Sequence, residues 1–250
     1  MILRVVLPPL LVLAVLLGAW ELYVDLGGID DLILASPSQI ATSLWDDRSL
    51  MLDNFWVTAQ EVGFGIVVSL LLGILLAFLI HGSDLARRAL YPLMVGSQAV
   101  PLVILSPLLV YWVGFGVLPK LAIIALICFF PVVVTTFDGL RSVDPDLRKL
   151  MTTLGASRRQ TLRFAELPAA LPAALSGARI AVAIAVIGAV LAESSGSEKG
   201  LGHLLLQSIP ALETARAYAA AAVMAAFALV LFYALGIAER RLLSYRPRSS

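Results

Sequence analysis

Six apolar segments, each about as long as a membrane-spanning helix, constrain the fold of this chain more than any other feature. A helix needs about 20 apolar residues to cross the roughly 30 Å of hydrocarbon in a bilayer. The six segments lie at residues 7–24, 57–80, 90–113, 117–137, 171–192 and 215–237. Together they occupy most of the 250 residues and leave no room for a separate soluble domain. We therefore expect an all-α membrane protein with six transmembrane helices, forming a single transmembrane domain over residues 1–250.

The first segment could instead be a cleaved signal peptide, because Arg4 precedes its apolar run. A signal peptide ends at a cleavage site made of small residues. Residues 20–23 have the sequence WELY, which does not form such a site. We therefore expect this segment to remain as a transmembrane helix.

The basic residues indicate the orientation, because lysine and arginine concentrate in cytoplasmic loops. With the N-terminus inside, 14 of the 18 lysines and arginines lie inside, including Arg4, Arg246 and Arg248. The four outside are Arg48, Lys120, Lys199 and Arg216. The reverse orientation would violate the rule, so we expect both termini and the loop at residues 138–170 in the cytoplasm.

That loop contains signals for a short helix that begins after Asp144. An aspartate caps a helix, and proline at position 145 fits the first helical turn, where its missing N–H costs nothing. One apolar stripe follows at helical spacing: Leu147, Leu150, Met151 and Leu154. Gly155 suits the left-handed position that ends a helix.

A second helix is expected to begin at Ser157, which forms an S-x-x-Q capping box with Gln160. It carries three arginines, Arg158, Arg159 and Arg163. We expect it to stop before Pro168, because proline breaks a helix interior. A basic helix-turn-helix at the face of a membrane indicates a docking element, although the arginines could serve only to hold the loop inside.

A short amphipathic helix is expected on the opposite side of the membrane, over residues 36–47. Ser36 and Gln39 form another capping box, and Pro37 occupies the first helical position. The segment suits a helix that lies at the membrane interface or against other spans.

The third apolar segment is interrupted by three prolines and several polar residues. Each proline removes a helical hydrogen bond and frees a carbonyl, which a membrane tolerates only where protein or water satisfies it. Interrupted helices are typical of translocation paths. The candidate pathway residues are Ser97, Gln98, Pro101, Ser106 and Pro107. A kinked helix packed by its neighbours is the alternative.

The sequence contains no pattern for an enzyme or for a metal site. It has no GxxxxGK[ST] phosphate loop, no HExxH and no CxxC, and the single cysteine, Cys128, is expected to be a packing residue. We therefore expect no catalytic residue, no metal ligand and no cofactor bound by this chain.

Charged residues near the span ends have ordinary interpretations. We expect His81 to be an interfacial anchor, Glu193 to be solvated and Lys120 to mark the end of a span. A proton- or sodium-driven carrier needs acids inside the membrane. We find no chain of such acids, so uphill transport would draw its energy from another protein, and an ion-coupled secondary transporter is the alternative.

The run GASRRQTLRFAELPAALP resembles the conserved cytoplasmic loop of ABC-importer permeases. That family has the pattern E-A-A-x-x-x-G followed by an apolar-Pro pair. Gly155 matches the glycine, and Leu167 with Pro168 matches the pair, whereas residues 149–151 are KLM in place of E-A-A. Nearly the whole chain is similar to the nitrate/sulfonate/taurine branch, and residues 100–120 resemble members assigned to thiamine-precursor pyrimidines or riboflavin.

This resemblance implies a permease subunit in the bacterial cytoplasmic (inner) membrane. It implies a pathway between two copies of the chain, two cytoplasmic ATPase subunits that bind ATP and magnesium, and an extracytoplasmic solute-binding protein. It implies contact with membrane lipid and none with nucleic acid. The residues implied in coupling to the ATPase are Gly155, Ala156, Ser157, Arg158, Arg159, Leu167 and Pro168.

Overall fold

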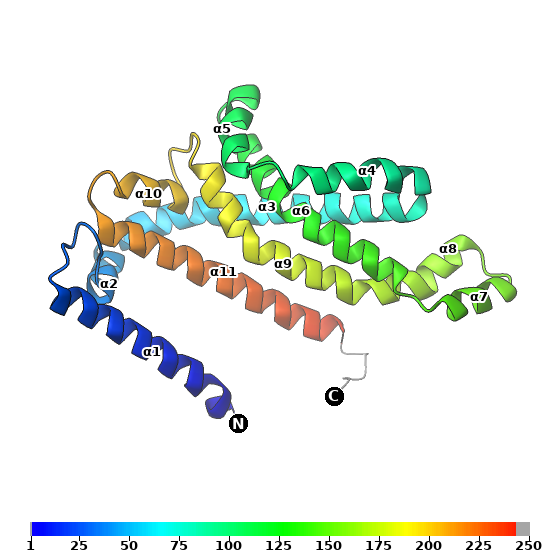
Figure 1. Ribbon diagram of the computed structural model, residues 1–250, viewed down its shortest axis with the longest axis horizontal. Coiled ribbons are helices and arrows are strands. Elements are labelled where there is room, and N and C mark those ends of the chain that lie inside the picture. Colours follow the sequence, from blue (N-terminus) through cyan, green and yellow to red (C-terminus); the bar gives the residue numbers. More distant parts are fainter. Residues whose placement is uncertain (1, 244–250) are drawn as a thin grey trace. The chain divides into compact units, whose positions relative to one another are not determined.

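The structure, a computed structural model, describes residues 2–243, with side chains described from residue 7 onwards. Arg246 and Arg248 lie outside the described residues, and so does the side chain of Arg4. The described chain is entirely helical (Figure 1). Its elements are α1 (Ile2–Gly27), α2 (Pro37–Asp46), α3 (Arg48–Gly82), α4 (Asp84–Ser97), α5 (Leu102–Val113), α6 (Val117–Arg141), α7 (Pro145–Thr153), α8 (Arg158–Thr161), the π-helix η1 (Leu162–Glu166), α9 (Leu167–Glu193), α10 (Leu201–Ser208) and α11 (Thr214–Leu242).

Five helical stretches are long and apolar enough to cross a membrane. They are Leu7–Gly27, Arg48–Gly82, Val117–Arg141, Arg158–Glu193 and Thr214–Leu242. Five of the six segments expected as spans thus lie in helices of sufficient length and apolarity, and the helix expected at 36–47 is present as α2, with its Ser36–Gln39 capping box.

The third expected span is not one helix. It is divided into α4 and α5, which are bent by 102° relative to each other. The amides of Gln98 and Ala99 bond to carbonyls three residues back, which tightens and ends α4. Pro101, which has no N–H, then stands at the start of α5. Pro92 and Pro107 lie inside their helices and do not interrupt them.

The chain groups into two compact units. Unit 1 contains residues 1–58 and 198–224, and unit 2 contains residues 59–197 and 225–250. Helices α3 and α11 contribute residues to both units, and the single domain expected over residues 1–250 stays a prediction.

In unit 1, side chains of α3 cap the start of α10. Asn54 accepts a hydrogen bond from the Gly200 amide at 2.7 Å, and Thr58 accepts one from the Leu201 amide at 2.8 Å.

The core of unit 2 is the pair α6 and α9, which run alongside each other (Figure 1). Small residues recur at every fourth position of α9: Gly177, Ala181, Ala185 and Ala189, all of them buried. This spacing forms one face on which two helix backbones can approach closely. A Cβ at Gly177 would lie only 2.9 Å from the carbonyl oxygen of Pro131 on α6.

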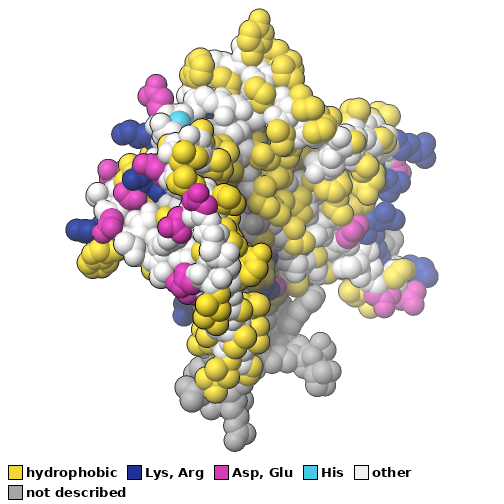
Figure 2. Space-filling model, turned by 60° about the vertical axis from the view of Figure 1, so that its left-hand side comes forward, with side chains coloured by type: hydrophobic (Ala, Val, Ile, Leu, Met, Phe, Trp, Pro, Cys, Tyr) yellow, Lys and Arg dark blue, Asp and Glu magenta, His cyan; other side chains and the backbone are white. Residues whose placement is uncertain are grey.

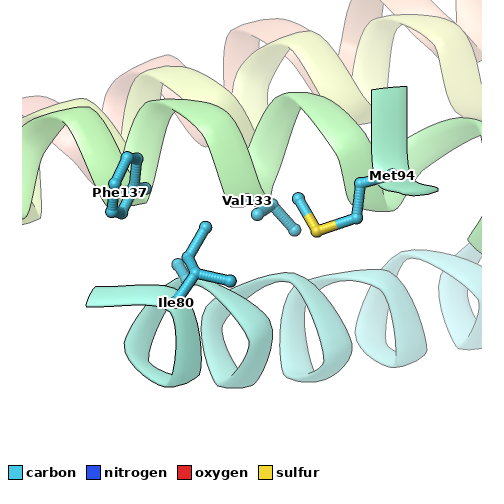
Figure 3. Packing of buried hydrophobic residues seen from close by; sticks show 5 residues of the cluster. Ile80, Met94, Val133 and Phe137 are labelled. Carbon is cyan, nitrogen blue, oxygen red and sulfur yellow. The ribbon is translucent and has the colours of Figure 1, made fainter. Parts of the chain in front are cut away.

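A second cluster packs α3 and α4 against α6. Figure 3 shows Ile80 of α3 and Met94 of α4 directed toward Val133 and Phe137 of α6. All four side chains are buried, and Ala77 of α3 completes the cluster. This packing fixes the end of α3 next to the end of α6.

Large apolar side chains remain exposed along the predicted spans, as a hydrocarbon solvent allows. On α1 they include Leu10, Val12, Val15 and Leu16, each more than half exposed. Apolar side chains also cover much of the surface in Figure 2, where charged side chains gather toward the margins. A water-soluble protein rarely exposes so much contiguous apolar surface, so these exposed apolar side chains agree with a membrane protein.

The close approach of α6 and α9 predicts that Gly177→Ala destabilises the protein. Forcing a methyl group into a packed contact costs about 1–3 kcal/mol, and each 1 kcal/mol lowers the melting temperature of a chain of this size by roughly 2–4 °C. Cys128 is fully buried, so its reaction with a thiol-reactive dye on heating reports unfolding. Gly63→Ala on α3 is the matched control, because nothing lies within 4 Å of the added methyl. Equal melting temperatures for the two variants would contradict the proposed packing.

Candidate functional site

A helical hairpin formed by residues 144–161 lies between α6 and α9. Asp144 caps α7, since its carboxylate accepts from the Asp146 amide at 2.8 Å. Gly155 then adopts a φ of +76°, and the Ala156 amide bonds back to the Met151 carbonyl. This left-handed turn ends α7 as expected.

Ser157 and Gln160 form the capping box expected at the start of α8. The Ser157 amide donates to Gln160 Oε1 at 2.7 Å, and the Gln160 amide donates to Ser157 Oγ at 3.3 Å. Arg158 on α8 donates to the carbonyl of Gly82, the last residue of α3, at 2.9 Å. This contact attaches the hairpin to α3.

The prediction that the second helix stops before Pro168 is wrong. The chain is helical from Arg158 to Glu193, because the π-helix η1 joins α8 directly to α9. In η1 the Leu167 amide bonds to the Leu162 carbonyl, five residues back. Pro168 directly follows this wider turn, so its missing N–H is accommodated there without a break in the helical path.

The leucines of α7, and Leu154 directly after it, lie on the surface of the protein. Leu147, Leu150 and Leu154 are exposed, Leu154 by 76%, and none of the α7 side chains is buried. Phe164 of η1 is also 66% exposed. Exposed apolar side chains interleaved with arginines are typical of a protein contact surface.

Glu166, at the end of η1, is a buried carboxylate with two partners. Its Oε2 lies 2.8 Å from Nε2 of His81 on α3, and its Oε1 lies 3.2 Å from Nη2 of Arg148 on α7. The same Arg148 nitrogen donates to the carbonyl of Leu140, near the end of α6. His81 is thus a hydrogen-bond partner of Glu166, directly after the hairpin, and not the simple interfacial anchor expected from the sequence.

A second buried cluster joins Glu61 of α3, Lys120 of α6 and Glu193 of α9. Lys120 donates to Glu61 Oε1 and to Ser197 Oγ, both at 2.6 Å. Glu61 and Glu193 are only 4% and 1% exposed, and Glu193 is a further hydrogen-bond partner of Glu61. The expectations that Glu193 is solvated and that Lys120 merely marks a span end are therefore wrong. Glu61 was overlooked, although a carboxylate inside a predicted span is itself a signal.

The candidate pathway residues fall into two groups. Ser97, Gln98 and Pro101 lie at the bend between α4 and α5, where Gln98 and Pro101 are exposed. Ser106 is instead buried and donates to the carbonyl of Leu191 on α9 at 2.7 Å. Pro107 follows it on the exposed side of α5. Among these five residues, the exposed polar side chain is that of Gln98, at the bend.

Unit 1 contains a polar cavity of about 340 Å³ beside α2. An ion pair forms part of its wall, since Arg216 contacts both oxygens of Asp47, at 2.8 and 3.1 Å. This guanidinium lowers the pKa of the Asp47 carboxyl below its ordinary value. The charged and polar lining residues are Asp31, Gln39, Ser43, Asp47, Glu213, Thr214 and Arg216.

Comparisons with known proteins agree on one kind of relative. The family model described as "Binding-protein-dependent transport system inner membrane component" matches residues 69–244. A probable ABC transporter permease protein of Haemophilus influenzae is 35% identical, over 92% of this chain and 94% of the relative. The formylaminopyrimidine transport permease protein ThiX of Halalkalibacterium halodurans is 34% identical, over 97% of each chain. The riboflavin transport system permease protein RibX of Chloroflexus aurantiacus is 32% identical, over 93% of this chain and 88% of the relative.

Solved structures show the same fold. A crystal structure of an amino acid ABC transporter with histidines matches with a TM-score of 0.67 and 16% identity, over 80% of this chain and 97% of that chain. The MetNI methionine ABC transporter in an inward-facing conformation matches with a TM-score of 0.58 and 19% identity, over 85% of this chain and 98% of that chain.

The buried cluster predicts a strong effect of Lys120→Met. Removing the ammonium leaves the Glu61 carboxylate buried without its charge partner, which costs about 3–5 kcal/mol. We expect the melting temperature to fall by roughly 6–20 °C, measured with the same dye reaction at Cys128.

Adding Glu61→Gln to Lys120→Met should restore much of this loss, because the carboxylate that loses its charge partner is then replaced by a neutral amide. Lys149→Met on α7 serves as the control for the loss of a lysine, because this exposed side chain pairs with the exposed Asp146 and such a surface pair contributes little to stability. A Lys120→Met protein as stable as this control would show that the pair does not hold the three helices together.

Proposed function

The chain belongs to the family of binding-protein-dependent transport system inner membrane components, and on this premise we propose how its helices and its hairpin act in solute import. It is a multi-pass protein of the bacterial inner membrane and the permease subunit of an ABC importer for small solutes. The ATPase of such an importer is a separate subunit, so this subunit is not an enzyme. The exposed surface of the helical hairpin is the observation that carries the proposal beyond family membership.

The hairpin is the coupling site for the ATPase. Its exposed leucines fit an apolar cleft, and Arg159 beside them fits an acidic rim. The left-handed turn at Gly155 presents Ala156, Ser157 and Arg158 at the tip between the two helices. Leu167 and Pro168 then begin α9, so a displacement of the hairpin passes into a transmembrane helix without a break.

The complete importer contains two copies of this chain, two ATPase subunits and a solute-binding protein. The distribution of basic residues supports a cytoplasmic hairpin and cytoplasmic termini. The polar cavity beside α2 then faces outward, and it offers the binding protein a predominantly acidic docking surface. ATP and magnesium bind to the ATPase subunits, which supply the energy for uphill transport.

The bend between α4 and α5 lines the translocation pathway. Gln98 provides a neutral amide there, next to Ser97 and Pro101, while the buried Ser106 fixes α5 against α9. Pro107 lies on the exposed side of α5 and completes the pathway surface. Neutral hydrogen-bonding groups favour an uncharged heterocycle, and the ThiX and RibX relatives are named for a formylaminopyrimidine and for riboflavin.

An ion-coupled secondary transporter is the second candidate function. The buried acids Glu61 and Glu193 favour it, because carboxylates inside a membrane often bind a coupling ion. The Lys120 ammonium already occupies one oxygen of Glu61, however, and this arrangement suits a structural ion pair. Dependence of transport on an ATPase separates the two functions.

The coupling proposal predicts that Gly155→Pro combined with Arg159→Glu releases the ATPase. Proline cannot adopt the positive φ of Gly155, and glutamate reverses a charge on the contact surface. We expect roughly tenfold less ATPase or still less to co-purify with the variant, which corresponds to a loss of about 1.4 kcal/mol or more of binding free energy.

Asp146→Asn is the matched control, since this carboxylate lies on α7 and pairs only with the exposed Lys149. Normal amounts of the variant in the membrane show that insertion is intact. Unchanged co-purification would place the ATPase contact elsewhere, and a wild type that holds no ATPase would favour the secondary transporter.

The pathway proposal predicts ATP-dependent uptake of a neutral aromatic heterocycle. Proteoliposomes with this chain, its ATPase and its binding protein are tested with labelled formylaminopyrimidine, riboflavin and taurine. We expect uptake of one of the two heterocycles and none of taurine, because an anionic sulfonate would lose its hydration without a cationic partner in the pathway. Uptake of taurine alone would contradict the neutral pathway.

A further inference from the structure

Glu166 stands where the helical hairpin meets the transmembrane helices. It is only 8% exposed, although it lies in η1, directly after the exposed helical hairpin. Its two oxygens contact different parts of unit 2: Oε2 contacts His81 at the end of α3, and Oε1 contacts Arg148 on α7. Through Arg148, which also bonds to the Leu140 carbonyl, the same carboxylate reaches the end of α6.

Burial makes these contacts difficult to give up. A carboxylate removed from water needs charged or hydrogen-bonding partners, and losing one of them leaves a buried group unsatisfied. When the hairpin moves, Glu166 and its partners therefore move together more easily than they separate. The carboxylate acts as a rigid joint between elements that are far apart in the sequence.

The local backbone places Glu166 in this position. It ends the π-helix η1, a wider turn of a kind that occurs frequently at functional sites in helices. Helix α9 is joined to α8 through η1 and follows the hairpin covalently. Helix α3 has no such connection to the hairpin. Two polar contacts link them instead: Glu166 with His81, and Arg158 with the Gly82 carbonyl.

We propose that Glu166 transmits the movement of the helical hairpin to α3, through its contact with His81. This inference rests on the proposed coupling of the hairpin to an ATPase. Glu166 and His81 are positioning residues: they touch neither solute nor nucleotide, and they make α3 move with α9 when the ATPase subunits close. Without them, the hairpin and α9 respond to nucleotide, and α3 follows less, through the Arg158 contact alone.

The experiment compares hydrogen–deuterium exchange of the complete importer with and without ATP and vanadate. Peptides covering residues 145–161 report the hairpin, and peptides covering residues 74–82 report the end of α3. In the wild type we expect vanadate trapping to change exchange in both regions. His81→Leu removes the contact between Glu166 and α3 but leaves Glu166 with Arg148 and leaves Arg158 with the Gly82 carbonyl, so we expect the change at 74–82 to become clearly smaller while that at 145–161 is preserved.

Three further variants separate transmission from a purely structural role. His81→Gln keeps a side-chain donor for Glu166, so the response of α3 should return. Glu166→Ala should behave as His81→Leu does, with full co-purification of the ATPase. Asp146→Asn, an exposed carboxylate on α7, should respond as the wild type in both regions.

The outcomes distinguish this inference from the proposed function. If the wild-type hairpin does not respond to trapping, the coupling site itself is wrong and the inference falls with it. If the hairpin responds and α3 responds equally in the wild type and in His81→Leu, coupling stands and transmission through Glu166 is overturned. Loss of the response in both His81→Leu and His81→Gln would also overturn it, since the hydrogen bond would then not be the cause.

Discussion

The close contact between α6 and α9 is the interaction on which the rest of unit 2 depends. Within hydrocarbon, water is not available to drive helices together, so association relies on close packing and on internally satisfied polar groups. The small-residue face from Gly177 to Ala189 supplies that packing. It also fixes the positions of the two ends of α9, where Glu166 and Glu193 each meet a side chain of α3.

These two ends are about 40 Å apart by the helical rise over 27 residues. At each end a buried carboxylate of one helix contacts a partner on another, which is an expensive arrangement unless the pairs are well formed. Helix α9 is therefore held by apolar contacts along its length and by buried polar contacts at its ends. Such a helix transmits displacement as a rod, because its contacts resist bending and its ends are attached to specific neighbours.

The features that could be predicted from the sequence are those set by neighbouring residues. The caps at Ser36, Asp144 and Ser157 and the turn at Gly155 follow from contacts between residues two to five apart, and the structure contains all of them. The two buried clusters could not be located in this way, because Lys120 is 59 residues from Glu61 and Glu166 is 85 residues from His81. The π-turn was also missed, since a proline normally ends a helix and the sequence does not reveal an added residue in the preceding turn.

The π-turn at η1 amounts to one extra residue accommodated in an otherwise α-helical path from Arg158 to Glu193. Each residue of an α-helix rotates the chain by about 100° and advances it by about 1.5 Å. Relatives that lack this residue would carry a regular helix, with the hairpin turned by about a quarter of a revolution about the axis of α9. The length of this five-residue segment would thus set the angle at which the hairpin is presented, independently of the side chains on its surface.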